Sequence, residues 1–285
     1  MKQLALILTI LVAAASCTLS AADAPKRHGW KEDMMGGPLY GNVESVTITR
    51  YSLKDSLGVL SRSEIKSKSC YKFKESGDVT ERAEYKSDGS LSWKYIYKYD
   101  TKGNNTEEAY YTSDGSLGGK EICKYDTKGN KTEAVLYKSD GSLQEKLIYK
   151  YDTKGNMTEE AMYASDSSLM WKVIYKYDTK GNKTEDAYCT LDGMLEWKLT
   201  YKYDTKGNNT EGAMYTSDGS LSSKYIYKYD TKGNKTEYAE YNSDGSLDYK
   251  SIYKYDSKDN ITEITKYDGE LRPTSQTVYT IIYRK

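Results

Sequence analysis

A glutamate that recurs at one position of a repeated pattern offers the first candidate chemistry. Glu107 has seven copies at steps of 26 residues: Glu81, Glu133, Glu159, Glu185, Glu211, Glu237 and Glu263. Carboxylates beside tyrosine hydroxyls can bind sugar hydroxyls or cations, and a suitably spaced pair can serve as the acid and nucleophile of a glycosidase. An active site is normally singular, however, so eight copies favour a structural hydrogen-bonding role over catalysis. We therefore expect a protein that is not an enzyme.

Histidine and cysteine chemistry is nearly excluded. His28 is the single histidine, which rules out histidine-dependent triads and histidine-rich zinc sites. Beyond the amino-terminal region the cysteines are Cys70, Cys123 and Cys189, an odd number that implies no disulfide framework. Cys123 and Cys189 occupy positions that are tyrosine in sibling repeats, which favours small buried hydrophobes. We expect no metal site and no cofactor.

Large aromatic residues at a variable position are the candidate ligand-binding groups. Within the repeated frame, one slot changes from copy to copy and holds Trp93, Trp171, Trp197 and Tyr249 in four of its copies. Tryptophan and tyrosine combine a large apolar ring with a polar group, which suits stacking on a ligand such as a polysaccharide or peptidoglycan. Core filling is the alternative for the same residues.

The elements that would position these residues come from a unit of 26 residues. The run from Tyr99 to Asn104, Tyr-Asp-Thr-Lys-Gly-Asn, returns at every step of 26, and seven units fill residues 73–254. Each unit has two halves with the frame tyrosine, three residues, glycine, and each half predicts a turn followed by a strand. The structural residues of the unit are Tyr99, Asp100, Gly103, Glu107, Tyr111 and Gly115. The aspartates of the Asp100 series are expected to stabilise their turns through side-chain hydrogen bonds.

The turns also predict which residues share a face of the sheet. Pairing Asp100 with Asn104 and Thr112 with Ser116 predicts an antiparallel meander with one aromatic face and one face of lysine, isoleucine and threonine. The aromatic face is predicted to hold Trp93, Tyr97, Tyr99, Glu107, Ala109 and Tyr111, and the other face Lys94, Ile96 and Lys98. We expect the aromatic face on the core side. Lysines repeated at the strand centres are incompatible with the lipid-facing band of an outer-membrane barrel.

The number of strands limits the shape. About eighteen strands fit between Val43 and Tyr283, and open twisted sheets rarely exceed about ten. An all-β fold is therefore expected, built as a curled shell, a spiral or a wide barrel with the tyrosines inside. A flatter elongated sheet and a propeller are the alternatives. A propeller with four-stranded blades predicts a 52-residue super-period, and the tryptophan slot shows no such alternation.

The repeat resembles a known bacterial family. The pattern Tyr-x-Tyr-Asp-x-x-Gly-Asn of Tyr97 to Asn104, followed by Ser113-Asp114-Gly115, is similar to the YD repeat of RHS-type proteins. This resemblance implies β-hairpin repeats in cell-surface proteins, with carbohydrate binding or toxin-enclosing shells as functions. Asn104 stands where that family commonly has arginine, and only residues 255–285 follow the repeats. The spacing of tyrosine and glycine is also similar to MORN-type repeats, which implies a contact scaffold.

The flanking segments indicate where the protein resides. Residues 1–22 read as a signal peptide with a twelve-residue apolar run, and Ala14 to Cys17 offers a competing lipoprotein site that would lipidate Cys17. Residues 23–36 are predicted to be a linker, 37–72 amino-terminal cap strands and 255–285 a carboxy-terminal cap. The periplasm, the cell surface and secretion all fit. A membrane contact is expected only through the lipid anchor.

The sequence-based hypothesis is a secreted or surface-anchored bacterial repeat protein that binds a repetitive carbohydrate or cell-wall ligand through a tyrosine-rich sheet. A scaffold for contacts with another surface protein is the alternative, and a glycoside hydrolase is a third reading. The formal net charge of +0 provides no basic field for nucleic acid.

Overall fold

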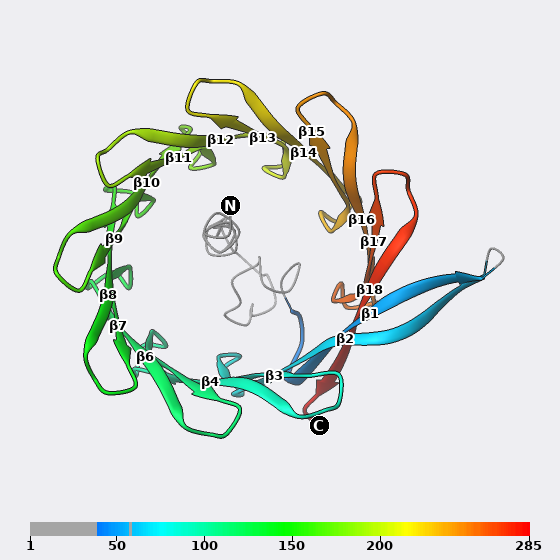
Figure 1. The fold of residues 1–285 in the computed structure, drawn as a ribbon, viewed down its shortest axis with the longest axis horizontal. Helices are drawn as coiled ribbons and strands as arrows, with labels where there is room; N and C mark the ends of the chain where they lie inside the picture. Colours follow the sequence, from blue (N-terminus) through cyan, green and yellow to red (C-terminus); the bar gives the residue numbers. More distant parts are fainter. Residues whose placement is uncertain (1–38, 57–58) are drawn as a thin grey trace.

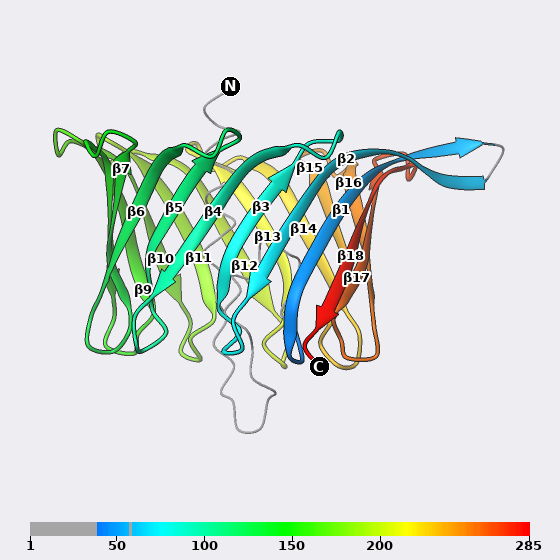
Figure 2. The same cartoon turned by 90° about the horizontal axis from the view of Figure 1, so that it is seen from below.

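The chain forms one antiparallel sheet that closes on itself. The structure is a computed structural model that describes residues 39–56 and 59–285. Eighteen strands follow one another around a ring, each paired with its neighbours in sequence, and β1 pairs with β18. The result is a β-barrel seen down its axis in Figure 1 and from the side in Figure 2. The predicted all-β meander and the strand number are confirmed.

The strands are regular in length through the repeats. Their bounds are β1 Val43–Ser56, β2 Val59–Phe73, β3 Val79–Tyr85, β4 Leu91–Tyr99, β5 Asn105–Thr112, β6 Leu117–Tyr125, β7 Lys131–Lys138, β8 Leu143–Tyr151, β9 Met157–Ala164, β10 Leu169–Tyr177, β11 Lys183–Thr190, β12 Leu195–Tyr203, β13 Asn209–Thr216, β14 Leu221–Tyr229, β15 Lys235–Asn242, β16 Leu247–Tyr255, β17 Ile261–Asp268 and β18 Pro273–Tyr283.

Closure distinguishes the structure from most of the expected shapes. Among the alternatives, the wide barrel is correct, and the open curled shell, the spiral, the elongated sheet and the propeller are wrong. The closing pair runs from Val43↔Tyr283 to Ser52↔Ser275. It removes both edges, which would otherwise present unpaired backbone groups to other chains. The strands β1 and β2 of the amino-terminal segment and β17 and β18 of the carboxy-terminal segment therefore form the part of the wall where the ring closes.

Each turn is built as its residues predict. In the first complete repeat, the Asp100 amide donates to the Asn104 carbonyl at 2.9 Å, and Gly103 adopts φ +85°. Asp100 Oδ1 accepts from the amides of Lys102 and Asn104, at 2.8 and 2.9 Å, and thereby satisfies donors that the turn leaves unpaired. Gly115 plays the part of Gly103 in the second turn, with φ +84°.

The register beyond the turns differs from the expected one by a single residue. The ladder shifts between Lys98 and Tyr99, so that Lys98 lies opposite Glu107 and Thr106 is the extra residue of a bulge. A second shift lies between Tyr110 and Tyr111, which leaves Gly118 as the extra residue. Because side chains alternate across a strand, one inserted residue moves the following set to the other face. The placement of Glu107, Ala109 and Tyr111 on the aromatic face is therefore wrong, whereas that of Trp93, Tyr97 and Tyr99 is correct.

The repeated Tyr99 joins neighbouring strands where their ladder ends. Pairing of β3 with β4 stops at Glu81↔Ile96, and the Tyr99 hydroxyl donates to the Val79 carbonyl at 2.7 Å. The same bond, over 20 residues of sequence, recurs at 2.7–2.8 Å for Tyr125, Tyr151, Tyr177, Tyr203, Tyr229 and Tyr255. Tyrosine is suited to this position because a phenylalanine ring would leave the carbonyl without that donor.

A turn that lacks glycine provides a test of this geometry. Ser167 stands in a glycine position and adopts φ +69°. Left-handed backbone costs an ordinary residue about 1 kcal/mol, so Ser167→Gly is expected to stabilise the barrel by about that amount and raise its melting temperature by roughly 2–4 °C. Thermal unfolding followed by circular dichroism measures the change.

The matched comparison is Asp259→Gly, at φ +64°. Aspartate tolerates this conformation better, and Asp259 accepts from Lys232 Nζ at 2.7 Å. Its replacement should gain less than Ser167→Gly. An unchanged or lower melting temperature for Ser167→Gly would contradict the strain argument.

Candidate ligand-binding wall

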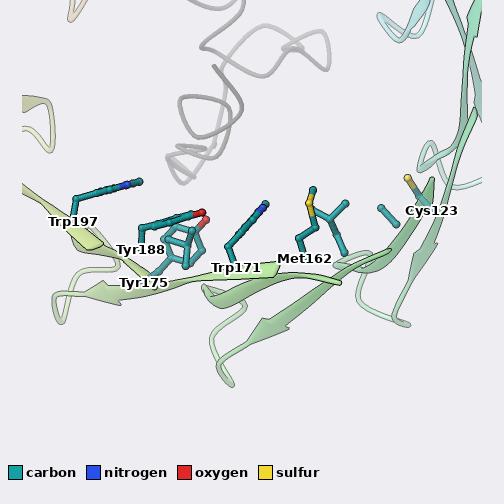
Figure 3. Packing of buried hydrophobic residues seen from close by; sticks show 9 residues of the cluster. Cys123, Met162, Trp171, Tyr175, Tyr188 and Trp197 are labelled. Carbon is teal, nitrogen blue, oxygen red and sulfur yellow. The ribbon is translucent and has the colours of Figure 1, made fainter. Parts of the chain in front are cut away.

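The barrel has two chemically different walls. Alternation along β4 directs Trp93, Tyr95, Tyr97 and Tyr99 inward and Lys94, Ile96 and Lys98 outward, and the copies follow the same rule. In Figure 3 the labelled side chains of Trp171, Tyr175 and Trp197 point to the inner side of the sheet. A barrel of about eighteen strands is wider than its side chains can fill. The inner wall is therefore the surface on which a ligand can be enclosed.

Two of the four predicted ligand-binding residues meet on this wall. Trp171 of β10, Tyr188 of β11 and Trp197 of β12 form a row, which we call the aromatic row (Figure 3). Ring centroids are 6.0 Å apart between Trp171 and Tyr188 and 5.2 Å apart between Tyr188 and Trp197, where the planes differ by 4°. The rings are 4–8% exposed. Their faces are used in stacking on one another, which stiffens this part of the wall.

Trp93 lies in a second, more accessible group on β3 to β5. Its indole is half-buried and meets Tyr95 edge-on at 5.5 Å, and Tyr95 lies 5.3 Å from Tyr110. The Arg82 guanidinium lies 4.8 Å from the Trp93 ring centroid. This group, which we call the Trp93 patch, combines aromatic rings with a cation and with the neighbouring Glu108 carboxylate, which lies opposite Tyr97.

Tyr249 lies in a third group on β14 to β17. It contacts Tyr238 at 5.5 Å between ring centroids, and Tyr238 stacks on Tyr225 at 6.2 Å. The Lys266 ammonium lies 3.5 Å from the Tyr249 centroid, and the Tyr238 hydroxyl donates to Glu240 at 3.0 Å. The structure thus distributes the four predicted residues over three groups around the ring and brings only Trp171 and Trp197 together.

A buried ion pair lies beside the aromatic row. On β11, Lys183 Nζ contacts Asp186 Oδ2 at 2.9 Å, and the Tyr201 hydroxyl donates to the same oxygen at 2.6 Å. Lys183 also lies 5.3 Å from the Tyr175 ring and 5.0 Å from the Tyr201 ring. Asp186 Oδ1 is buried and has no hydrogen-bond partner among the described residues. Burial raises the pKa of Asp186, although the Lys183 ammonium opposes that shift.

The glutamates of the Glu107 series lie on the outer wall. Glu107 pairs with Lys98 at 2.7 Å, and Glu133 contacts both Lys124 at 2.6 Å and Lys146 at 2.5 Å. These lysines hold the pKa of Glu133 below its usual range. The row of carboxylates is thus engaged by lysine and separated by the sheet from the inner tyrosines, which removes the expected surface of glutamates beside tyrosine hydroxyls.

The sequence did not predict the inner carboxylates, because the bulge at Thr106 depends on the pairing of two strands. The slot that faces inward is that of Glu108, and its copies are Arg82, Ala134, Glu160, Asp186, Gly212, Tyr238 and Ile264. Outer slots repeat nearly unchanged, because each lysine and glutamate completes the same ion pair. Inner slots other than the nearly constant Tyr97 and Tyr99 positions differ from repeat to repeat, since each one fits a different neighbourhood. This difference in variability is the signal that could have separated the two walls.

The remaining candidates offer little chemistry. No group of three metal-ligating side chains is present within residues 39–56 and 59–285. Cys123 faces inward and donates to Glu121 at 3.0 Å, and burial raises the pKa of its thiol to about 12, which disfavours the reactive thiolate at neutral pH. Cys17, the predicted signal peptide of residues 1–22 and the predicted linker of 23–36 lie outside the described residues. No helix in the described part of the chain could span a bilayer.

Comparison with known proteins yields distant likenesses. A family model described as "Uncharacterised protein" matches residues 122–228, and no curated protein matches the chain. Among solved structures, a porin-like protein from Bacteroides uniformis has 10% identity and a TM-score of 0.46, over 84% of this chain and 98% of that one. One from Bacteroides vulgatus has 11% identity and a TM-score of 0.34, over 85% and 98%.

A toxin complex is also similar over most of this chain. The TcdB2-TccC3-TEV structure has 11% identity and a TM-score of 0.36, and the match covers 85% of this chain but 16% of the other. At these identities and TM-scores the likenesses assign no function. The YD-repeat resemblance is not confirmed by them.

Proposed function

We propose that this chain is an extracytoplasmic, non-enzymatic bacterial protein that binds carbohydrate on the inner wall of its barrel. The observation that carries the proposal is the Trp93 patch, in which half-buried rings of Trp93, Tyr95 and Tyr110 lie beside the Arg82 guanidinium. Ligand sites combine concave apolar or aromatic surfaces with a few polar groups that set orientation. Sugars match this chemistry, since they present both C–H faces and hydroxyls.

The two walls have different roles: the outer wall faces water and the inner wall binds the ligand. The outer wall repeats paired lysine and glutamate, as in Lys98–Glu107 and Lys202–Glu211, both 2.7 Å apart. Such a surface favours contact with water over contact with lipid, because one lysine on the lipid face of a barrel at the bilayer midplane destabilises it by about 2–4 kcal/mol. The inner wall varies and is aromatic. The signal peptide of residues 1–22 supports export, and a lipid on Cys17 would tether the exported barrel.

Fluorescence titration tests the proposal. Residues 23–285 titrated with soluble peptidoglycan fragments and a panel of polysaccharides should give a saturable change in tryptophan emission. Trp93→Ser copies Ser223, which occupies the same slot five repeats further along the chain, so the fold should tolerate it. We expect affinity to fall at least about tenfold, equivalent to about 1.4 kcal/mol, since the largest accessible ring of the patch is removed.

The buried tryptophan Trp197 provides the matched control. Trp197→Phe keeps an aromatic ring in the aromatic row and leaves the Trp93 patch untouched, so its affinity should equal that of the unmodified chain. If no member of the panel changed the tryptophan emission of a chain that still melts cooperatively, carbohydrate binding would be contradicted. This outcome would favour the alternative of a scaffold for another surface protein.

A further inference from the structure

Exposed apolar side chains gather at one end of the barrel. We call this end the Ser-Asp-Gly rim, formed by the turns 86–90, 112–116, 138–142, 164–168, 190–194, 216–220, 242–246 and 268–272. Of the exposed large hydrophobic residues in the described ranges, only Ile282 belongs to the other end. Those at or beside this rim are Val59, Leu60, Ile65, Leu117, Met170, Leu191, Met194, Leu195, Leu221 and Leu271.

The exposure is greatest at the turn between β11 and β12. Leu191 is 71% exposed and Met194 is 67% exposed. The corresponding residues of the turn 112–116 are Ser113 and Ser116, so this one turn replaces two serines with apolar side chains. The register Trp171↔Thr190 places Met170 beside Leu191. The apolar peak of the rim therefore spans two neighbouring hairpins.

A belt of tyrosines encircles the outer wall directly below the same rim. Tyr111 lies opposite Leu117 in the last residue pair before the turn. It is also paired with the outward-facing Lys94, so its side chain lies on the outer wall. Half-buried tyrosines hold this position in seven hairpins: Tyr85, Tyr111, Tyr137, Tyr163, Tyr215, Tyr241 and Tyr267. Tyrosine is enriched where lipid meets water, because its ring is apolar and its hydroxyl is polar.

A projecting ribbon extends this surface sideways. Pairing of β1 with β18 ends at Ser52, and pairing of β2 with β3 begins at Lys68, so the intervening parts of β1 and β2 pair only with each other. Figure 2 shows this ribbon leaving the wall at the level of the Ser-Asp-Gly rim. Val59 near its tip is 68% exposed. The rim and the ribbon together present apolar groups at one level.

The charges of the Ser-Asp-Gly rim indicate which kind of surface can cover it. Each of its eight turns carries an aspartate, and only three carry a lysine or arginine, at Lys86, Lys138 and Arg272. Two acidic rims of two copies would repel each other if they met face to face. An anionic surface would be repelled in the same way. A zwitterionic lipid surface with exposed ammonium groups accommodates both the aspartates and the apolar side chains.

We propose that the Ser-Asp-Gly rim rests on a lipid surface rich in phosphatidylethanolamine, with Leu191 and Met194 entering the headgroup region. Interfacial binding of this kind combines buried apolar area with headgroup electrostatics and requires no membrane-spanning segment. The barrel then stands on the membrane with its axis along the bilayer normal, and its lysine-rich outer wall remains in water. This contact is independent of carbohydrate binding on the inner wall.

Vesicle flotation tests this contact. Residues 23–285, which contain the whole described barrel but neither the signal peptide nor Cys17, are mixed with phosphatidylcholine vesicles containing phosphatidylethanolamine, or with vesicles containing phosphatidylglycerol. We expect flotation with the ethanolamine vesicles and several-fold less with the glycerol vesicles. Leu191→Ser with Met194→Ser should lower the floated fraction at least fivefold, since it restores the serines found in the sibling turn.

The controls separate a lipid contact from other uses of the rim. Ile282→Ser removes an exposed apolar residue at the opposite end, which is 51% exposed, and should leave flotation unchanged. Circular dichroism melting verifies that each variant folds. Absence of flotation, equal flotation of the double serine variant, or a preference for the anionic vesicles would overturn the proposal. So would self-association in sedimentation velocity that the double variant abolishes without any effect on lipid binding.

Discussion

Raising the pH above 10 is expected to unfold this barrel in one steep transition. Burial raises the pKa of the inner-wall tyrosines, to about 12 for Tyr125, Tyr151 and Tyr253 and further for Tyr97 and Tyr149. A phenol whose pKa is higher in the folded chain stabilises the fold fully below the unfolded pKa of 10. That stability is lost as the pH rises through the folded pKa, because the unfolded chain ionises first.

The number of tyrosines makes the effect large. A shift of two pKa units at a largely buried group such as Tyr253 corresponds to about 3 kcal/mol, and less for partly exposed rings. The contributions of several such groups add up to an amount comparable with the 5–15 kcal/mol that is typical for the stability of a domain. Phenolate absorbance near 295 nm and far-ultraviolet circular dichroism, recorded against pH, should change together.

A conservative variant sharpens this prediction. Tyr253→Phe keeps the ring and removes one ionisable hydroxyl, so its alkaline midpoint should lie at higher pH than that of the unmodified chain. The chain in denaturant provides the reference titration of unfolded tyrosine. If most tyrosines ionised near pH 10 while the circular dichroism of the barrel persisted, the inner wall would be freely hydrated and the argument from burial would fail.

Removing Asp186 is expected to be among the most destabilising single changes. Asp186→Ala leaves the Lys183 ammonium, whose side chain is 10% exposed, without its carboxylate partner and deprives the Tyr201 hydroxyl of its acceptor. Breaking a buried ion pair from one side typically costs about 3–5 kcal/mol. Chemical denaturation of the variant and of the unmodified chain measures the difference in free energy of unfolding.

The segment that follows the seven repeats supplies the matched control. Ile261 and Ile264 occupy the positions of Lys183 and Asp186, so Lys183→Ile with Asp186→Ile copies a pair that the barrel already contains. Replacing both partners of a buried pair by apolar residues is often neutral or stabilising. The double variant should therefore be more stable than Asp186→Ala. A double variant that is less stable than the single one would show that the ion pair itself stabilises this wall.

Local features of the fold were predictable because they depend on neighbours in sequence. Asp100 and Gly103 are five residues or fewer from every group they satisfy in their turn, so the pattern alone predicts the turn and its geometry. The 26-residue period predicts the hairpins for the same reason. The inward direction of Trp93 and Tyr97 also followed correctly from alternation along a single strand.

The register of the strands and the composition of the site were harder to predict from the sequence. The bulge at Thr106 depends on how two strands twist against each other, and it moved Glu107 to the outer wall. The grouping of Trp171 with Trp197 depends on the adjacency of β10, β11 and β12, whereas Trp93 and Tyr249 are held apart by the circumference of the ring. The Lys183–Asp186 pair is close in sequence, but its burial arises from the neighbouring strands.

The repeated hairpins of an all-β chain, their turns, the approximate number of strands and the aromatic character of one face could all be predicted from the amino-acid sequence. These follow from interactions over a few residues, repeated at a constant spacing. Closure of the sheet through β1 and β18, which lie more than 200 residues apart, became evident only in the three-dimensional structure. Closure depends on twist accumulated over the whole sheet, which no single repeat encodes. The direction of the carboxylates also became evident only in the three-dimensional structure, because one extra residue at each bulge reverses the two faces of the sheet.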